Sequence, residues 1–231
     1  MPNEIVKKED NFISTNNNIS EALGEEMAGL SITFDRIKTP SGGGLAYEVP
    51  GDNPEEPELE KEFDAVILYH HPMLSYYKEK YNGSNEAPNC SSINGVVGID
   101  RDSGEIRQCK DCPLNMFGSG ENGGKACKAK RRLFILRKGE ALPVIFTVPT
   151  SSVGDFSKYI MRLVSKNKKS NQVVTRFSLK KAQNSSGITY SKVVVNVARN
   201  LTDEEIKSME SMSAQVKAIA QNLQENYESE E

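Results

Sequence analysis

The chain has 231 residues and a mass of 25.6 kDa, which is enough for one good-sized hydrophobic core with small additions. Its 37% hydrophobic and 26% charged residues fall in the range of soluble globular proteins, although the mean hydropathy of −0.54 indicates some unfolded polar sequence. It contains neither an apolar run long enough for a membrane-spanning helix nor the N-terminal pattern of a secretory signal, so we expect a cytoplasmic protein with no membrane partner.

The net charge of −3 hides a strong segregation of charge along the chain. Residues 1–64 carry a net charge of −10, residues 65–104 carry −1 and residues 201–231 carry −6. Residues 105–200, in contrast, carry 19 Lys and Arg against 5 Asp and Glu, a net charge of +14. Clustered cations generate the positive field that phosphates seek, so this central block indicates a polyanionic partner.

The chain begins with residues 1–27, which are polar, show little apolar periodicity and are expected to be disordered. A single core domain is expected over residues 28–205. Its first elements are a strand at residues 31–38, a turn at residues 42–44 (GGG), a strand at residues 45–49, an acidic loop at residues 51–62 and a strand at residues 63–69.

The middle of the chain, about residues 86–130, holds all four cysteines among many Gly and Asn and has hardly any sustained periodicity. This is typical of a loop region held together by a metal ion, and we call it the cysteine module. The elements expected after it are strands at residues 132–137 and 142–148, a helix that begins with a serine cap after Pro149, and strands at residues 172–179 and 189–196.

The C-terminal helix, expected over residues 202–224, has the clearest signature, because Thr202 and Glu205 form a capping box ahead of helically spaced apolar residues. Residues 225–231 then form a short acidic tail. About six or seven strands and two helices with mostly hairpin connections predict an α+β domain built on a small antiparallel sheet or barrel.

The four cysteines have the spacing C-x18-C-x2-C-x14-C, and the central pair brings two thiolates onto one turn. Four sulfur ligands suit a tetrahedral Zn²⁺ and leave no open position for catalysis, so the spacing predicts one structural zinc ion. An Fe–S cluster, a redox-active C-x2-C pair and four ordinary thiols are the alternatives. The expected metal ligands are Cys90, Cys109, Cys112 and Cys127.

Cations cluster around the last cysteine and recur farther along the chain, and aromatic residues lie among them. Such a mixture can bind phosphates and stack on unpaired bases, although a single lysine is more often a solvated surface residue and a single aromatic more often belongs to the core. The candidate nucleic-acid contacts are Lys125, Lys128, Lys130, Arg131, Arg132, Arg176, Lys192, Tyr76, Tyr77 and Phe117.

The two histidines, His70 and His71, have no partners at metal-binding spacing, and we expect them to be structural or hydrogen-bonding residues. The sequence contains no Ser-His-Asp order, no Gly-rich phosphate loop and no paired-carboxylate motif. These observations favour a protein that is not an enzyme.

Several motifs of the chain resemble, over about residues 30–205, a family of tailed-phage proteins associated with single-stranded-DNA binding near replication and recombination genes. The motifs are residues 40–44 (PSGGG), 88–91 (PNCS), 109–119 (CKDCPLNMFGS), 124–128 (GKACK) with Arg131 and Arg132, 148–151 (VPTS) and 187–191 (GITYS). The resemblance implies a zinc module inserted into an oligonucleotide-binding-type (OB-like) β-barrel, in the cytoplasm of the host cell.

The leading hypothesis is a DNA-binding protein of phage replication or recombination that binds single strands without sequence specificity, through a basic groove with aromatic stacking. Its acidic tail would compete with DNA or recruit replication and recombination proteins, or would simply be a solubilising terminus. The alternative is a zinc-containing phage regulator that binds a host or phage protein through the C-terminal helix. A nuclease or helicase accessory subunit is a third possibility.

Overall fold

The longest strand, β4 (Glu62–Tyr76), organises the fold of the computed structural model, which describes residues 19–30, 32–51, 53, 56–79, 87–184 and 187–229. One edge of β4 pairs antiparallel with β8 (Lys128–Arg137). The other edge pairs first with β10 (Val173–Gln183) and farther along with β5 (Cys90–Ser92). The apolar, β-branched start of β4 favours an extended conformation.

The remaining strands extend this pair into a mixed nine-stranded sheet. Its order is β1-β9-β8-β4-β5-β6-β7, and β10 and β11 attach to the first part of β4. The parallel pair is β1 with β9, and the other registers are antiparallel. The further strands are β1 (Arg36–Ile37), β6 (Val97–Asp100), β7 (Ile106–Gln108), β9 (Val144–Val148) and β11 (Thr189–Asn200), and β2 (Tyr47–Val49) with β3 (Glu58–Glu60) forms a separate two-stranded sheet.

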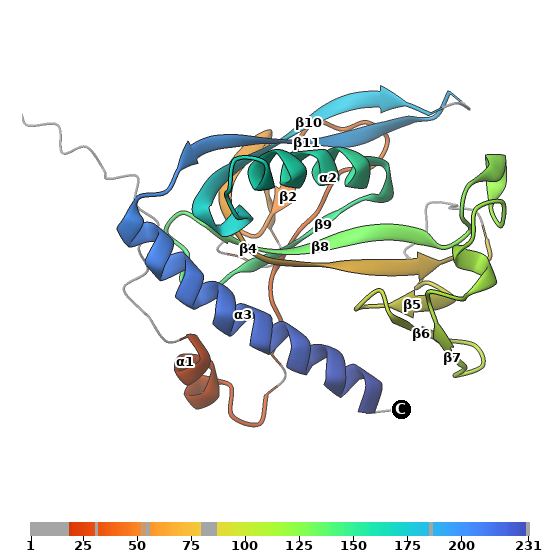
Figure 1. The fold of residues 1–231 in the computed structure, drawn as a ribbon, viewed down its shortest axis with the longest axis horizontal. Coiled ribbons are helices and arrows are strands. Elements are labelled where there is room, and N and C mark those ends of the chain that lie inside the picture. The colour runs from red at the N-terminus through yellow and green to blue at the C-terminus, as the bar shows by residue number, and fades with distance from the viewer. Residues whose placement is uncertain are drawn as a thin grey trace, which may run out of the picture.

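The α+β class is therefore confirmed, but the described strands form an open sheet and do not close into the expected OB-like barrel. The reason lies in β4, whose edge is shared by two sets of strands. β10 pairs with it only as far as Val66, and β5 begins to pair at Leu74. The β10–β11 hairpin and the β4–β8 pair thus diverge as two arms (Figure 1).

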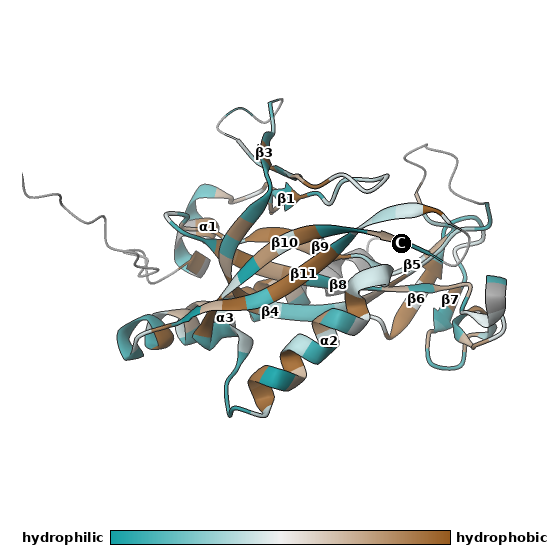
Figure 2. Ribbon diagram, turned by 90° about the horizontal axis from the view of Figure 1, so that it is seen from above, coloured by the Kyte–Doolittle hydropathy of each residue, from teal (hydrophilic) through white to brown (hydrophobic). Residues whose placement is uncertain are grey.

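One face of the sheet carries the larger core. Phe63, Ala65 and Ile67 alternate along β4 toward this face, where they meet α2 (Thr150–Val164) and the small β2–β3 sheet. Hydrophobic and hydrophilic residues alternate along α2 (Figure 2), as expected of a helix with one buried side. Tyr159 of α2 also forms a buried hydrogen bond of 2.6 Å with Thr175 of β10.

The opposite face carries a second core, covered by α3 (Asp203–Ser229) and α1 (Ile19–Glu26) (Figure 1). The apolar stripe of α3 is used here, because Met209, Met212, Val216 and Ala220 are all buried. The capping box of α3 is confirmed: the Thr202 amide donates to the Glu205 carboxylate at 2.9 Å, and the Glu205 amide donates to the Thr202 hydroxyl at 3.3 Å.

Several boundaries differ from the sequence-based expectations. The expected disorder of residues 1–27 is wrong for α1, because Ile19 is buried against the second core; residues 1–18 lie outside the described residues. α3 continues through residues 225–229 of the expected acidic tail, and residues 230–231 lie outside the described residues. The expected serine cap of α2 is also wrong, since Pro149 occupies the cap and the Ser152 hydroxyl instead accepts the Val193 amide at 3.0 Å.

Candidate metal centre and nucleic-acid interface

The four cysteines come from separate parts of the cysteine module and converge on one small cavity. Cys90 begins β5, Cys109 and Cys112 flank the turn after β7, and Cys127 immediately precedes β8. The cavity measures about 10 Å³, close to the space occupied by a single water-sized sphere. All four cysteines are free thiols rather than disulfides.

Hydrogen bonds fix the turn that carries the central cysteine pair. The Cys109 amide donates to the Val96 carbonyl at 2.8 Å, and the Cys127 amide donates to the Leu114 carbonyl at 2.8 Å. The side chain of Asn115, in the short 3₁₀ helix η1 (Pro113–Asn115), donates to the Cys109 carbonyl at 2.7 Å. These contacts bring the first and last parts of the module toward the central pair.

Gly98 of β6 lies directly against the sulfurs. A Cβ at this position would lie 3.2 Å from the Cys90 Sγ and 3.4 Å from the Cys109 Sγ, closer than most real Cβ contacts. The absence of a side chain therefore leaves room for the sulfur atoms. The sequence pattern indicates only a flexible glycine in a loop at this position. It does not reveal that a side chain here would crowd the cysteine sulfurs.

The sulfurs surround the cavity without yet coordinating around a common point. Within the described ranges, no three His, Cys, Asp or Glu side chains already have metal-holding geometry. The donor set nevertheless fits a closed zinc site, because four thiols line one cavity with room for little more than an ion.

The environment of the thiols does not resemble that of a redox-active pair. Burial raises the pKa of Cys109, the first member of the C-x2-C pair. A reactive C-x2-C cysteine instead has a lowered pKa and lies at a helix N-terminus or beside a cation. In the described part of the module, Cys109 follows a strand and Cys112 precedes only the short η1.

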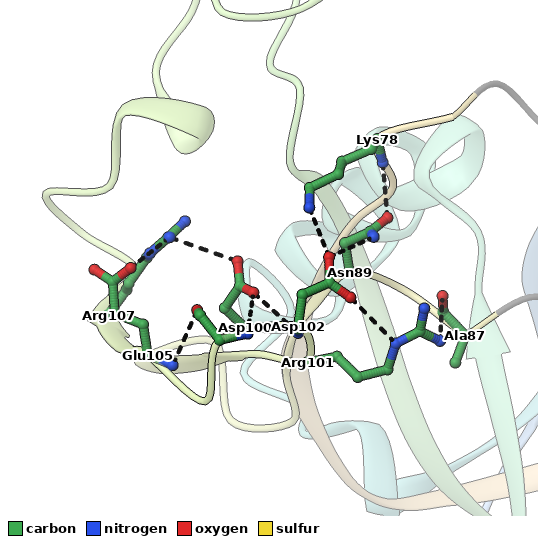
Figure 3. A network of polar contacts seen from close by, with 9 residues as sticks. Lys78, Ala87, Asn89, Asp100, Arg101, Asp102, Glu105 and Arg107 are labelled. Atoms are coloured by element: carbon green, nitrogen blue, oxygen red, sulfur yellow. Dashed lines mark hydrogen bonds and ion pairs between the residues drawn. The ribbon is translucent and has the colours of Figure 1, made fainter.

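A polar network holds the β6–β7 hairpin against the end of β4 (Figure 3). Lys78 and Asn89 both donate to the Asp102 carboxylate, at 2.6 and 3.2 Å. Arg107 pairs with Glu105 at 2.6 Å and with Asp100 at 3.5 Å, and its side chain also lines the cysteine cavity. The network therefore anchors the side of the module that supplies Gly98.

The cations after Cys127 lie within β8, which begins four residues earlier than the predicted strand at 132–137. Side chains alternate along a strand, so Lys128, Lys130 and Arg132 lie on the side of Phe134, which faces the second core. Arg131 lies on the opposite side with Leu133, toward α2. The sequence cluster is thus divided between two faces of the sheet.

In the part of the chain that the structure describes, Lys128, Lys130 and Arg131 contact neutral groups rather than carboxylates. The Lys128 Nζ donates to the Lys125 carbonyl at 2.7 Å, and the Lys130 Nζ lies 5.8 Å from the centre of the Tyr77 ring. Arg131 donates to the His70 Nδ1 at 2.9 Å. Burial lowers the pKa of both Lys130 and Arg131, so each charge would gain from an anionic partner.

Two other candidate cations are already neutralised within the protein. Arg176 of β10 forms a bidentate pair with Asp64, with both bonds at 2.8 Å. Lys192 of β11 pairs with Asp155 of α2 at 2.8 Å. These residues lie on the β10–β11 arm rather than beside the cations of β8, so the structure does not bring them into one groove with the cysteine module.

The three candidate aromatics have different environments. Tyr76 is partly buried, lines the cysteine cavity and packs against the small cluster of Leu74, Cys109 and Cys127. Tyr77 is 40% exposed beside Lys130. Phe117, in the loop after η1, is 83% exposed, and the Lys125 Nζ lies 5.1 Å from the centre of its ring.

The two histidines do not line the cysteine cavity. His70 accepts hydrogen bonds from Arg131 and lies edge-on to Phe156 of α2, and burial followed by the charge of Arg131 lowers its pKa to about 4. His71 packs its ring against Tyr69. Both contacts agree with structural and hydrogen-bonding roles.

No helix within the described ranges is long and apolar enough to cross a membrane. No family model, no curated protein and no solved structure matches the chain. What the site does must therefore be inferred from its own geometry.

Proposed function

We propose that the chain is a non-enzymatic, single-stranded-DNA-binding protein of phage replication or recombination. One observation carries the proposal: β8 bears Lys128, Lys130 and Arg132 on the same side of an open sheet, and Lys128 and Lys130 contact neutral groups. Cations spaced two residues apart along a strand repeat about every 6.6–6.8 Å, close to the spacing of phosphates in an extended polynucleotide.

Exposed aromatic side chains beside these cations support single strands over duplex. Tyr77 accompanies Lys130 and Phe117 accompanies Lys125, so each pair offers a ring for a base and an ammonium group for its phosphate. Bases in a duplex are stacked on one another and cannot reach such rings, whereas unpaired bases can. Stacking is tolerant of sequence, which accounts for binding without sequence specificity.

We further propose that Cys90, Cys109, Cys112 and Cys127 hold one structural Zn²⁺. The convergence of four free thiols on one small cavity supports this assignment. Four thiolate ligands suit the tetrahedral coordination of Zn²⁺ and would leave no open position on the ion. The ion would do no chemistry and would hold the module at the start of β8.

The acidic residues at the C-terminus are proposed to recruit replication or recombination proteins. The alternative, a phage regulator that binds its partner through the C-terminal helix, receives less support. The apolar side of α3 is already buried against the sheet as far as Ala220, so that stretch offers a partner little apolar surface.

The test is a titration of fluorescent single-stranded DNA, duplex DNA and RNA oligomers at several salt concentrations. We expect single strands to bind best, with affinity falling steeply as salt rises. Lys128→Gln with Lys130→Gln should weaken binding and reduce the slope of log K against log salt by about 1 to 2. The matched control removes two exposed lysines elsewhere, Lys166 and Lys217. Absence of binding at low salt, or equal effects of both double substitutions, would contradict the proposal.

A further inference from the structure

The loop after η1, residues 116–124, presents two large apolar side chains to solvent. Phe117 is 83% exposed and Met116 is 53% exposed, although both belong to a densely hydrogen-bonded part of the module. Exposed apolar residues on flexible loops are common, but residues held outward by a fixed backbone are pre-organised for a contact. What this loop can bind therefore depends on what holds its backbone.

The backbone of the loop is closed on itself. The Gly118 amide donates to the Gly123 carbonyl at 3.0 Å, and the Gly120 amide donates to the Gly124 carbonyl at 2.9 Å. The Ser119 hydroxyl donates to the Met116 carbonyl at 2.6 Å and accepts the Ala126 amide at 3.0 Å. A Cβ at Gly120 would lie 2.7 Å from the Ala126 nitrogen, so the two sides of the loop are in direct contact.

A short chain of contacts connects the Phe117 ring to the central cysteine pair. Asn115 donates its side-chain amide to the Cys109 carbonyl at 2.7 Å, and its Oδ1 accepts the Lys125 ammonium at 3.2 Å. The same ammonium lies 5.1 Å from the centre of the Phe117 ring. Asn115 thus positions the Lys125–Phe117 pair with respect to the cysteines.

We propose that Phe117 and Lys125 form a subsite for one unpaired nucleotide, with the base stacked on the ring and the phosphate bound by the ammonium group, and that Asn115 is its positioning residue. This inference rests on the proposed single-strand binding and adds a defined contact to it. Lys125 approaches the ring, while most of the ring surface remains open for a base. Base–aromatic stacking and cation–π contacts are the two interactions such a pair supplies.

A nucleotide fits this pair better than an apolar pocket of a protein partner does. Insertion into an apolar pocket would bury the Lys125 ammonium beside the ring, at a desolvation cost. A nucleotide instead supplies both a flat base and an anion. The loop also precedes β8 by only a few residues, so one strand of nucleic acid can contact Phe117 and the β8 cations in succession.

The chain contains no tryptophan, so Phe117→Trp introduces a single fluorescent reporter at the subsite. We expect a base-bearing single-stranded oligomer to quench this fluorescence at saturation, and an abasic oligomer of equal length and charge to leave it unquenched. Met161→Trp on α2, where Met161 is 66% exposed, serves as the control and should not respond to either oligomer. Quenching of both reporters, or of neither, would overturn the subsite.

Affinity measurements provide a second, independent readout. Phe117→Ala should weaken binding of the base-bearing oligomer on the order of tenfold and leave the abasic oligomer nearly unaffected, whereas Lys128→Gln should weaken both. Asn115→Ala should reproduce part of the Phe117→Ala loss with the base-bearing oligomer and should affect the abasic oligomer much less. If the wild-type protein binds and depends on Lys128 but Phe117→Ala has no effect, only the subsite is wrong and the proposed single-strand binding stands. If the wild-type protein binds neither oligomer, the proposed function itself fails.

Discussion

At Gly98 the main chain passes directly against two cysteine sulfurs. A methyl group there would lie 3.2 Å from the Cys90 Sγ and 3.4 Å from the Cys109 Sγ, so Gly98→Ala should push the sulfurs out of the cavity. We propose one zinc ion per chain for the wild type, and we expect the variant to retain much less zinc when both are measured by elemental analysis. Gly154→Ala in α2 is the control, because a methyl group at Gly154 would meet no heavy atom of another element within 4 Å. Equal zinc contents in both variants would refute the assignment.

The partly buried side chain of His70 should make the stability of the fold depend on pH. Burial and the neighbouring Arg131 and His71 lower its pKa from 6.5 to about 4, so the unfolded chain binds this proton more readily than the folded one. The contribution of neutral His70 to the unfolding free energy is therefore fully present above about pH 6.5. It is lost as the pH falls toward 4, by up to about 3 kcal/mol.

Urea unfolding at pH 7.5 and at pH 4.5 measures this loss. His70→Gln keeps a hydrogen-bonding side chain that does not titrate, so the fall in unfolding free energy between the two pH values should become smaller. His71, whose pKa is also lowered by burial, remains in both proteins and contributes to the residual dependence, together with carboxyl groups such as Asp102 and Glu105 whose pKa is lowered by their cationic partners. An identical fall in wild type and variant would show that His70 is not the titrating group.

At the scale of elements, β4 and β8 are where sequence-based prediction reached its limit. The apolar run at 63–69 predicted a strand, but β4 continues through His70 and His71 to Tyr76. Pro72 has no N–H to donate to a neighbouring strand. It is tolerated because, on the edge of β4 opposite β8, β10 pairs only up to Val66 and β5 pairs only from Leu74, and none of the described strands pairs in between. The Tyr76 carbonyl accepts the Asn89 amide on this edge. Backbone groups of every second residue in a strand point to the same edge, so the Pro72 nitrogen points to this edge as well. Only tertiary pairing reveals which edge is open.

The candidate site could likewise be predicted only where its features are local in the sequence. Cysteine spacing predicted that four thiols come together, since the C-x2-C turn and glycine-rich loops are local features. The positions of the cations depended instead on where β8 begins. A strand starting at residue 132 leaves Arg131 in a loop, whereas a strand starting at Lys128 separates it from Lys130 and Arg132. The ion pairs of Arg176 and Lys192 involve residues far away in sequence and had no local signal.

The packing of α3 leads to a prediction about stability. Met209 is fully buried in the second core, so Met209→Ala should lower the unfolding free energy by about 2–5 kcal/mol, through lost burial and the cavity left behind. Met161→Ala, at a position 66% exposed on α2, should change it by less than about 0.5 kcal/mol. Denaturant unfolding of both variants measures the difference. Similar small losses would mean that α3 is only loosely attached and free for another partner.

Across the whole molecule, hydrophobic contacts are divided unequally between the sheet and the cysteine module. The two faces of the sheet carry large cores, whereas the cysteine module has a small cluster formed by Leu74, Cys109 and Cys127 with Tyr76 and Leu114. A cluster of this size buries too little apolar surface to offset the entropy of ordering the loops around it. A bound metal ion would supply the missing stabilisation, as it does in other small metal-dependent modules.

Removal of the metal should consequently disorder the module and leave the rest of the fold in place. After zinc chelation, amide hydrogen exchange should accelerate in β5, β6 and β7 and stay slow in β10, β11 and α3, whose contacts belong to the two large cores. Single-strand affinity should fall at the same time, because the Lys125–Phe117 pair is positioned through Asn115 and the Cys109 carbonyl. Uniform acceleration across the chain would show that the module and the sheet unfold as one unit. Exchange unchanged in β5–β7 would show that the module needs no metal for its order.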